Sequence, residues 1–282
     1  MWFGSADRRY DGHFGHRHDR YDRYDDWHDR GDYWHVAKQP LAILCFLLPL
    51  IAAYELGAHY ISTGNADPVR NGADYWIRTS LADLGGDQPW LLPAVVLGAL
   101  VLWQVVGQYR WKISGATLLG MLIESAIFGF CLVLIGEVQE MAFQQLQPVP
   151  HDAPRAAIDV PHARELTRAI SFLGAGIYEE VLFRAAILPI CYLVFRVLLP
   201  HGMAVFLAIV VSSLLFSGAH YVGPAADEFN TFGFVFRAIA GAFFAVVMVL
   251  RGFGITVGTH AAYDIFVGIL LPAKLLETWM AG

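Results

Sequence analysis

Seven long apolar runs set the strongest limit on how this 282-residue chain can fold. A run of about 20 apolar residues can cross the hydrocarbon core of a bilayer as an α-helix. Only helices and closed barrels satisfy the backbone there, and the runs lack the alternation of barrel strands. The expected spans lie at residues 41–60, 90–108, 116–143, 166–199, 203–221, 232–250 and 254–275.

The fourth run is too long for one ordinary crossing. Pro189 lies inside it and lacks the backbone N–H that continues a helix, so this run could be two segments. The composition also favours a membrane protein, because 56% of residues are hydrophobic and 16% are charged, against about 25% charged in soluble domains. The sequence therefore predicts an all-α, polytopic membrane helical bundle with seven or eight transmembrane helices.

The first 38 residues form a different region, which is charged, aromatic and rich in histidine. It has no apolar stretch like that of a signal peptide, and its repeated theme DRYDRYDDWHDR is typical of a low-complexity arm. We expect a disordered tail at 1–38 and a transmembrane domain at 39–282. Seven basic residues precede the first span, whereas Arg70 and Arg78 are the basic residues of the following loop. This bias predicts a cytoplasmic N-terminus.

Composition also limits the classes of molecule that this protein can bind and the covalent links it can form. The net charge of −6 argues against nucleic acid, and three cysteines inside apolar runs predict no disulfide framework. The tail histidines lack zinc-finger spacing and cysteine partners, which favours a solvated tail over metal binding. These histidines are His13, His16, His18, His28 and His35.

Ionisable residues inside the C-terminal spans are the candidate functional groups, because each is costly in lipid and normally faces a protein interior or a water-filled cavity. They occur in three segments, YEEVLFRAAIL, LLFSGAHY and GTHAAYDIF. In chain order they are Glu179, Glu180, Arg184, His220, His260 and Asp264.

Helical spacing predicts how the first segment is arranged. Residues four apart lie on one helix face, so Glu180 can meet Arg184. Glu179 is rotated by a quarter turn or more around the same helix and could point into a cavity. Taken alone, the Glu180–Arg184 pair could equally be a structural ion pair.

The other two segments follow the same rule. His260 and Asp264 share a helix face, and Phe216 stands four residues before His220, where its ring can orient the imidazole. A lone intramembrane histidine is often only an interhelical hydrogen-bonding group. Together, however, three helices could direct an acid, two imidazoles and a carboxylate to one point.

This set suits hydrolysis by an activated water. Glu179 is the candidate general base, and a histidine near the same water could orient it or share its proton. The other histidine could donate toward an oxyanion. Asp264 cannot donate when ionised, so it must be protonated there or must orient His260.

The three motifs resemble the CAAX prenyl protease 2-like and bacteriocin-processing intramembrane peptidases, the CPBP or Abi family. That family carries Glu-Glu-x-x-x-Arg, then Phe-x-x-x-His, then His-x-x-x-Asn/Asp on separate membrane helices. Here they stand as EEVLFR from 179, FSGAH from 216 and HAAYD from 260. The resemblance covers about residues 170–269.

The resemblance implies a mostly eight-helix fold and a peptidase domain whose motif-bearing core is about 166–275. It implies that Glu179 is the water-activating base with His220 as its partner, and that His260 and Asp264 lie at the oxyanion side. Arg184 would brace Glu180. Many family members carry Asn where this chain has Asp264.

A metal is the main alternative for the chemistry. Glu179, His220 and His260 could ligate zinc, although the sequence has no HExxH motif. We favour a metal-free glutamate mechanism with no cofactor. The predicted partners are membrane lipids and a membrane-anchored peptide or protein, which can be lipid-modified or processed at its C-terminus.

Two other functions use the same helices. A non-proteolytic scaffold or self-immunity protein of the same family would bind a partner without cleaving it. A proton-coupled transporter is less favoured, because the sequence shows no internal repeat or paired broken helices.

Other polar and small residues in the spans predict contacts between helices. Glu124 and Arg237 are expected to pair between spans. Gly254 and Gly258 form a small-xxx-small pair that could bring the His260 helix near the helix of Glu179, with a dimer interface as the alternative. The loops at 57–89 and 146–164 look irregular.

Overall fold

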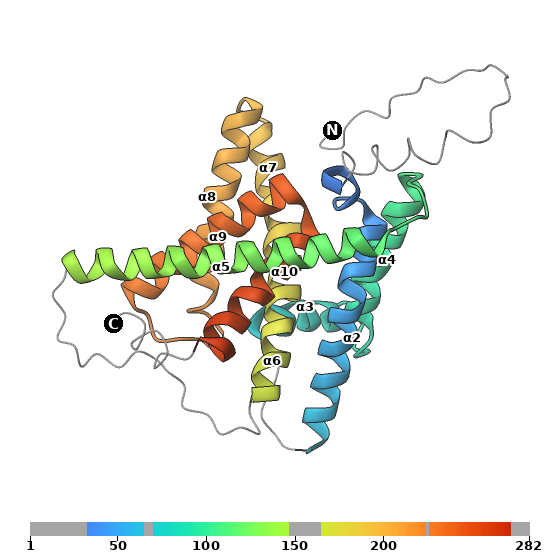
Figure 1. Ribbon diagram of the computed structural model, residues 1–282, viewed down its shortest axis with the longest axis horizontal. Helices are drawn as coiled ribbons and strands as arrows, with labels where there is room; N and C mark the ends of the chain where they lie inside the picture. Colours follow the sequence, from blue (N-terminus) through green and yellow to red (C-terminus); the bar gives the residue numbers. More distant parts are fainter. Residues whose placement is uncertain (1–32, 65–69, 147–164, 224–225, 272–282) are drawn as a thin grey trace, which may run out of the picture.

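The computed structural model describes residues 33–64, 70–146, 165–223 and 226–271, and these residues form helices and no strand (Figure 1). The expected all-α fold is therefore confirmed for this part of the chain. In order, the elements are α2 (Pro40–Gly64), α3 (Gly72–Asp83), α4 (Leu91–Val106), α5 (Gly115–Leu146), α6 (Glu165–Gly174), the π-helical η2 (Ala175–Glu179) and η3 (Val181–Ile187), α7 (Leu188–Arg196), α8 (His201–Ala219), α9 (Thr231–Arg251), α10 (Phe253–Ile265) and the π-helical η4 (Phe266–Leu270).

Five helices in the described residues are long and apolar enough to cross a membrane. They are Pro40–Ser62, Gly115–Gln145, His201–Ala219, Thr231–Arg251 and Phe253–Leu270. The expected span at 90–108 appears as the shorter apolar helix α4, and the expected span at 166–199 appears as the run from α6 to α7. The predicted number of seven or eight crossings is not confirmed.

The run from α6 to α7 changes its hydrogen-bond pattern where the first motif lies. It is α-helical to Gly174, π-helical through most of 175–187, and α-helical again from Leu188. Pro189 stands in the first turn of α7, where the missing N–H is tolerated. The division expected near Pro189 is thus a change of helix type within one continuous run. Such π-helical insertions are frequent at functional sites.

Close backbone approaches hold α10 in the centre of the molecule. A Cβ on Gly258 would lie 2.3 Å from Ser125 Oγ, and one on Gly254 would lie 2.9 Å from a Met121 carbon, so both glycines face α5. The His260 helix does lie against the helix of Glu179, as expected, but these two glycines do not make the contact. Gly176 makes that approach instead, because a Cβ there would lie 2.9 Å from Ala261.

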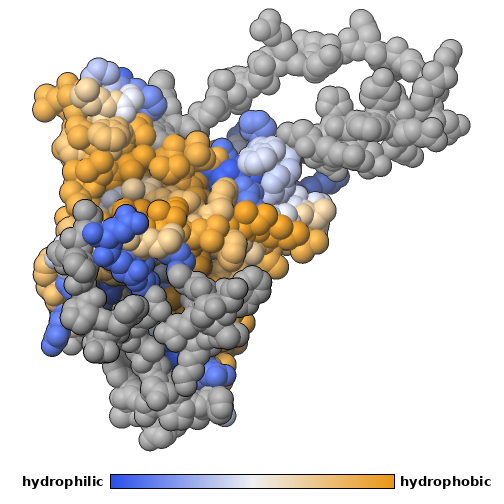
Figure 2. All heavy atoms as spheres, turned by 60° about the vertical axis from the view of Figure 1, so that its left-hand side comes forward, coloured by the Kyte–Doolittle hydropathy of each residue, from blue (hydrophilic) through white to orange (hydrophobic). Residues whose placement is uncertain are grey.

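The helices cross rather than run as one parallel bundle. In Figure 1, the long α5 lies nearly horizontal and passes across α2, while α7 and α8 run side by side toward the top. Figure 2 shows a broad hydrophobic surface interrupted by smaller hydrophilic areas. Exposed apolar side chains among the described residues include Leu119 and Ile127 of α5 and Phe206 of α8. Lipid is the natural solvent for such a surface.

The described end of the predicted tail packs against the helices. Tyr33 donates a 2.7 Å hydrogen bond from its hydroxyl to Glu124, and the Arg251 guanidinium lies 3.7 Å from the Trp34 ring centroid. Residues 33–38 therefore belong with the helical body, and residues 1–32 of the predicted tail lie outside the described residues. The expected loop at 146–164 lies outside them except for its first residue.

The expected pairing of Glu124 with Arg237 is wrong. Glu124 forms an ion pair with Arg251, whereas Arg237 pairs with Asp227. Both arginines lie on α9, but fourteen residues of helix separate them by about 21 Å. Glu124 meets the arginine at the C-terminal end of α9.

Candidate active site

The structure brings the three sequence motifs together around the π-helical turn. Glu179 ends η2, His220 caps the C-terminus of α8, and His260 and Asp264 lie on α10. All four side chains are mostly shielded from solvent, with side-chain exposures from 6% to 26%.

Glu179 lies between the two imidazoles without a hydrogen bond to either. Its Oε2 is 3.8 Å from Nε2 of His260 and 4.0 Å from Nε2 of His220. These separations are too long for direct hydrogen bonds. The Oε2 atom is buried and has no hydrogen-bond partner in the part of the chain that the structure describes. Separations of this size suit a water molecule that bridges the polar atoms.

The local fold fixes the orientation of His220. Its Nδ1 lies 2.9 Å from the carbonyl oxygen of Phe216. A carbonyl can only accept, so Nδ1 is the donor and Nε2, the nitrogen that faces Glu179, is free to accept. The Phe216 ring packs edge-on against the imidazole at 5.0 Å between centroids, which confirms the expected contact.

His260 is held on several sides. Its Nδ1 lies 2.7 Å from Oε1 of Glu180, and its ring stacks on Phe244 with centroids 4.5 Å apart. Its Nε2 lies 3.6 Å from Oδ2 of Asp264, so the predicted shared face is confirmed. The contact with Glu180 leaves Nε2 as the nitrogen that faces the other carboxylates.

Glu180 and Arg184 form the predicted ion pair beneath the site. Nε of Arg184 lies 3.1 Å from Oε2 of Glu180, and both side chains are almost fully buried. Arg184 also donates to the carbonyl oxygen of Gly241 at 3.1 Å and lies 4.4 Å from the Phe216 ring centroid. Glu180 thus links the arginine to His260.

The sequence does not predict two parts of this arrangement. The first is the contribution of α9, because neither Gly241 nor Phe244 belongs to a motif. The second is the contact between Glu180 and His260, which are 80 positions apart. No local spacing signals a contact of that range.

The predicted zinc ligands lie close together but do not form a metal-binding cluster. Among the described residues, no group of three or more His, Cys, Asp or Glu side chains is arranged to hold a metal ion. Glu179, His220 and His260 do converge, and these are the side chains that would hold a zinc ion. A metal chelator distinguishes a zinc site from a site that holds a water alone.

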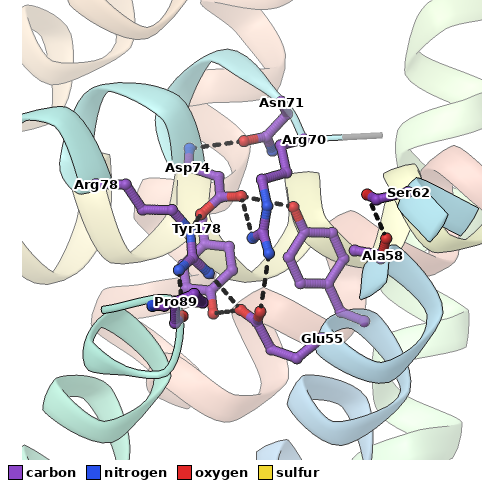
Figure 3. Close-up of polar contacts among 10 residues, drawn as sticks. Glu55, Ala58, Ser62, Arg70, Asn71, Asp74, Arg78, Pro89 and Tyr178 are labelled. Atoms are coloured by element: carbon purple, nitrogen blue, oxygen red, sulfur yellow. Dashed lines mark hydrogen bonds and ion pairs between the residues drawn. The ribbon is translucent and has the colours of Figure 1, made fainter. Parts of the chain in front are cut away.

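A second charged cluster lies next to the site and was also missed (Figure 3). Arg70 and Arg78 each bind both Glu55 of α2 and Asp74 of α3, at distances from 2.6 to 3.3 Å. Two tyrosine hydroxyls complete it. Tyr54 donates to Asp74 at 2.8 Å, and Tyr178 donates to Glu55 at 2.5 Å.

The prediction of an irregular loop at 57–89 is wrong in part, because residues 72–83 of this segment form helix α3, which carries Asp74 and Arg78 of the cluster. Asn71 caps that helix through a 2.8 Å hydrogen bond from the backbone N–H of Asp74. The spacing of Arg70, Asp74 and Arg78 at intervals of four was the available sequence signal. Burial disfavours the charged form of Arg70, but the hydrogen bond and charge of Asp74 outweigh burial, and the pKa of Arg70 lies above its ordinary value.

Fold and site together define an integral membrane protein of apolar helices with a buried carboxylate–histidine centre. Residues 165–266 match the family model described as type II CAAX prenyl endopeptidase Rce1-like. The resemblance predicted from the three motifs is confirmed over this segment, and it supports a membrane protease at the level of the family. No curated protein and no solved structure matches the chain.

Proposed function

We propose that this chain is an intramembrane endopeptidase that hydrolyses a peptide bond in a membrane-associated substrate. The observation that carries the proposal is the buried Oε2 atom of Glu179, which has no hydrogen-bond partner and faces Nε2 of both His220 and His260. An unpaired buried carboxylate oxygen is costly in a structural role. Its orientation suits a group that the site binds during the reaction.

That group is the attacking water. A water has two protons to donate, and Glu179 and the Nε2 atom of His220 are both acceptors about 4 Å apart. Donation to both would leave a water lone pair directed at the substrate carbonyl. Glu179 takes the proton as the water attacks and passes it to the departing amine, which balances the reaction without another proton source.

His260 is the proposed donor to the oxyanion. With both ring nitrogens protonated, it donates to Glu180 from Nδ1 and toward the substrate oxygen from Nε2. Asp264 lies 3.6 Å from that nitrogen and acts by orienting the ring and stabilising its charge. Arg184 and Phe216 hold Glu180 and His220 in place.

The finer assignments are part of the same proposal. The substrate is membrane-anchored and lipid-modified or processed near its C-terminus, as the CAAX prenyl description of the family suggests. The peptidase domain comprises 39–282 together with the packed residues 33–38 and has seven or eight crossings. The N-terminus is cytoplasmic, and the mechanism needs no metal. Membrane lipids are the surrounding partners.

The test is cleavage of a library of membrane-tethered peptides by the purified full-length protein in lipid. Wild type is compared with Glu179→Gln and His220→Ala, each with and without a metal chelator. Glu140→Gln is the matched control, because it makes the same chemical change on α5, where Glu140 binds Gln144 of its own helix.

We expect cleavage by wild type and Glu140→Gln, and none by the two site variants. Resistance to the chelator would support the metal-free mechanism, while sensitivity would favour zinc. A folded wild type that cleaves no peptide of the library would contradict the proposal and favour a non-proteolytic scaffold.

A further inference from the structure

Arg237 lies on the face of α9 that borders the candidate active site. Counting along the helix, Gly241 is four residues on and Phe244 is seven residues on, so the three share one face. Gly241 accepts a hydrogen bond from Arg184, and Phe244 stacks on His260. The Arg237 guanidinium therefore stands one turn beyond groups that touch the centre of the site.

A second contact places the guanidinium near His220. Arg237 pairs with Asp227, whose backbone N–H donates to the carbonyl oxygen of His220 at 2.9 Å. It also lies 5.3 Å from the ring centroid of Tyr221, the residue after His220. Its positive charge interacts electrostatically with both Glu179 and His220.

The guanidinium is only partly satisfied. Its Nη2 meets Asp227, but its Nη1 is a buried atom without a hydrogen-bond partner. The Asp227 side chain is 51% exposed, and exposed ion pairs contribute little stability. A second carboxylate can therefore replace Asp227 at small cost and bind both nitrogens in the planar, two-point geometry that arginine favours.

The surroundings select for an apolar residue next to that carboxylate. The rings of Tyr221, Phe229 and Phe234 contact one another with centroids 5.1 to 6.2 Å apart. Phe229 is 67% exposed, so part of this aromatic surface is open to a ligand. A cation beside exposed rings fits a terminal carboxylate carried by an apolar residue.

We infer that Arg237 binds the C-terminal carboxylate of the substrate in place of Asp227. This inference rests on the proposed peptidase function. It makes Arg237 a specificity-determining residue outside the three motifs.

The first test measures binding, which does not depend on cleavage. Full-length Glu179→Gln in lipid is titrated with three fluorescent membrane-tethered peptides of one sequence: a free acid with an apolar last residue, its C-terminal amide, and an amide with Asp as the last residue. We expect the free acid to bind about tenfold or more tightly than the first amide, the size of a charge-assisted contact.

Variants of the pair identify the cation. Adding Arg237→Gln should bring the ratio of the two dissociation constants close to one, and Arg237→Lys should keep part of the preference, because lysine retains the charge but not the planar geometry. Asp227→Asn leaves Arg237 in place and removes its competitor, so it should tighten binding of the free acid. This last variant tests the inference even if Arg237→Gln does not fold.

Several results would overturn the inference. They are equal binding of acid and amide, no binding of any peptide, a ratio that Arg237→Gln does not change, or weaker binding of the acid to Asp227→Asn. Tighter binding of the Asp-terminated amide than of the free acid would assign the carboxylate to a side chain and overturn the inference.

Cleavage by wild type then separates the two proposals. Equal KM values for acid and amide would reject the role of Arg237 while the peptidase function stands. A binding preference without any cleavage would reject the peptidase function while the carboxylate site stands.

Discussion

Among the described residues, the charged cluster shown in Figure 3 and the candidate active site differ in how completely their polar atoms are paired. In the cluster shown in Figure 3, all four carboxylate oxygens of Glu55 and Asp74 accept hydrogen bonds from arginine or tyrosine. In the candidate active site, Oε2 of Glu179 accepts none, and its nearest imidazole nitrogens lie 3.8 and 4.0 Å away.

This difference separates a structural cluster from a reactive one. A fully paired network in a low-dielectric interior fixes the positions of its helices, since each broken contact exposes a buried charge. An incompletely paired carboxylate is left free for a substrate or a water. The two clusters touch along the chain, because Tyr178 belongs to the first and Glu179 to the second.

The largest expected effect is on activity, at Glu179. Replacement with Gln removes the base but preserves shape, so the cleavage rate should fall by about 10²–10⁴, the usual contribution of general acid–base catalysis. The unfolding midpoint should stay near that of wild type, since no hydrogen bond to Oε2 is lost. Rate and midpoint are measured on the same preparation. A large drop in the unfolding midpoint would mean that Glu179 has a structural role like that of Glu55 and Asp74.

The next effect is on stability, at Asp74. Its side chain is fully buried and binds both arginines and Tyr54. Asp74→Ala leaves two cations without one of their carboxylates and should lower the free energy of unfolding by about 3–5 kcal/mol. Chemical denaturation in mixed micelles measures it. Asp83→Ala, an exposed change on the same helix, is the control, and equal losses for the two variants would contradict a structural role.

The contrast also explains which features the sequence could predict. The i, i+4 pairs of Glu180 with Arg184 and His260 with Asp264 follow from helix geometry alone, and the structure has both. The order of the motifs predicted that they meet, but not that Glu180 bridges to His260. That contact depends on how α10 packs against the π-helical turn through Gly176.

The predictions that fail also concern contacts that depend on how the helices pack. The sequence predicts the wrong arginine for Glu124, because both candidates lie on α9 and only the packing shows which end of that helix Glu124 meets. Glu55 lies in the expected span at 41–60, but its two arginine partners lie in the segment 57–89, which the sequence predicts to be an irregular loop. A polar helix such as α3 has little hydrophobic pattern to reveal it, and its stability comes from tertiary contacts.

A smaller effect is expected at Tyr178, where the two clusters meet. Its hydroxyl donates to Glu55, which keeps both arginines when the hydroxyl is lost. Tyr178→Phe should therefore lower the free energy of unfolding by about 1–2 kcal/mol, less than Asp74→Ala. Tyr75→Phe, an exposed change on α3, is the control in the same denaturation experiment. A loss as large as that of Asp74→Ala would mean that the network depends on the tyrosine.

The smallest expected effect concerns a third cluster, where the partly buried Tyr33 donates to Glu124 beside Arg251. Burial, followed by the hydrogen bond and charge of Glu124, raises the pKa of Tyr33 to about 12, whereas an unfolded tyrosine ionises near pH 10. The folded protein thus keeps this proton when the unfolded chain has lost it. The stability from this hydroxyl is present below about pH 10 and falls as the pH rises toward 12. Unfolding midpoints across this range should decline more steeply for wild type than for Tyr33→Phe, and identical slopes would mean that solvent already screens the contact.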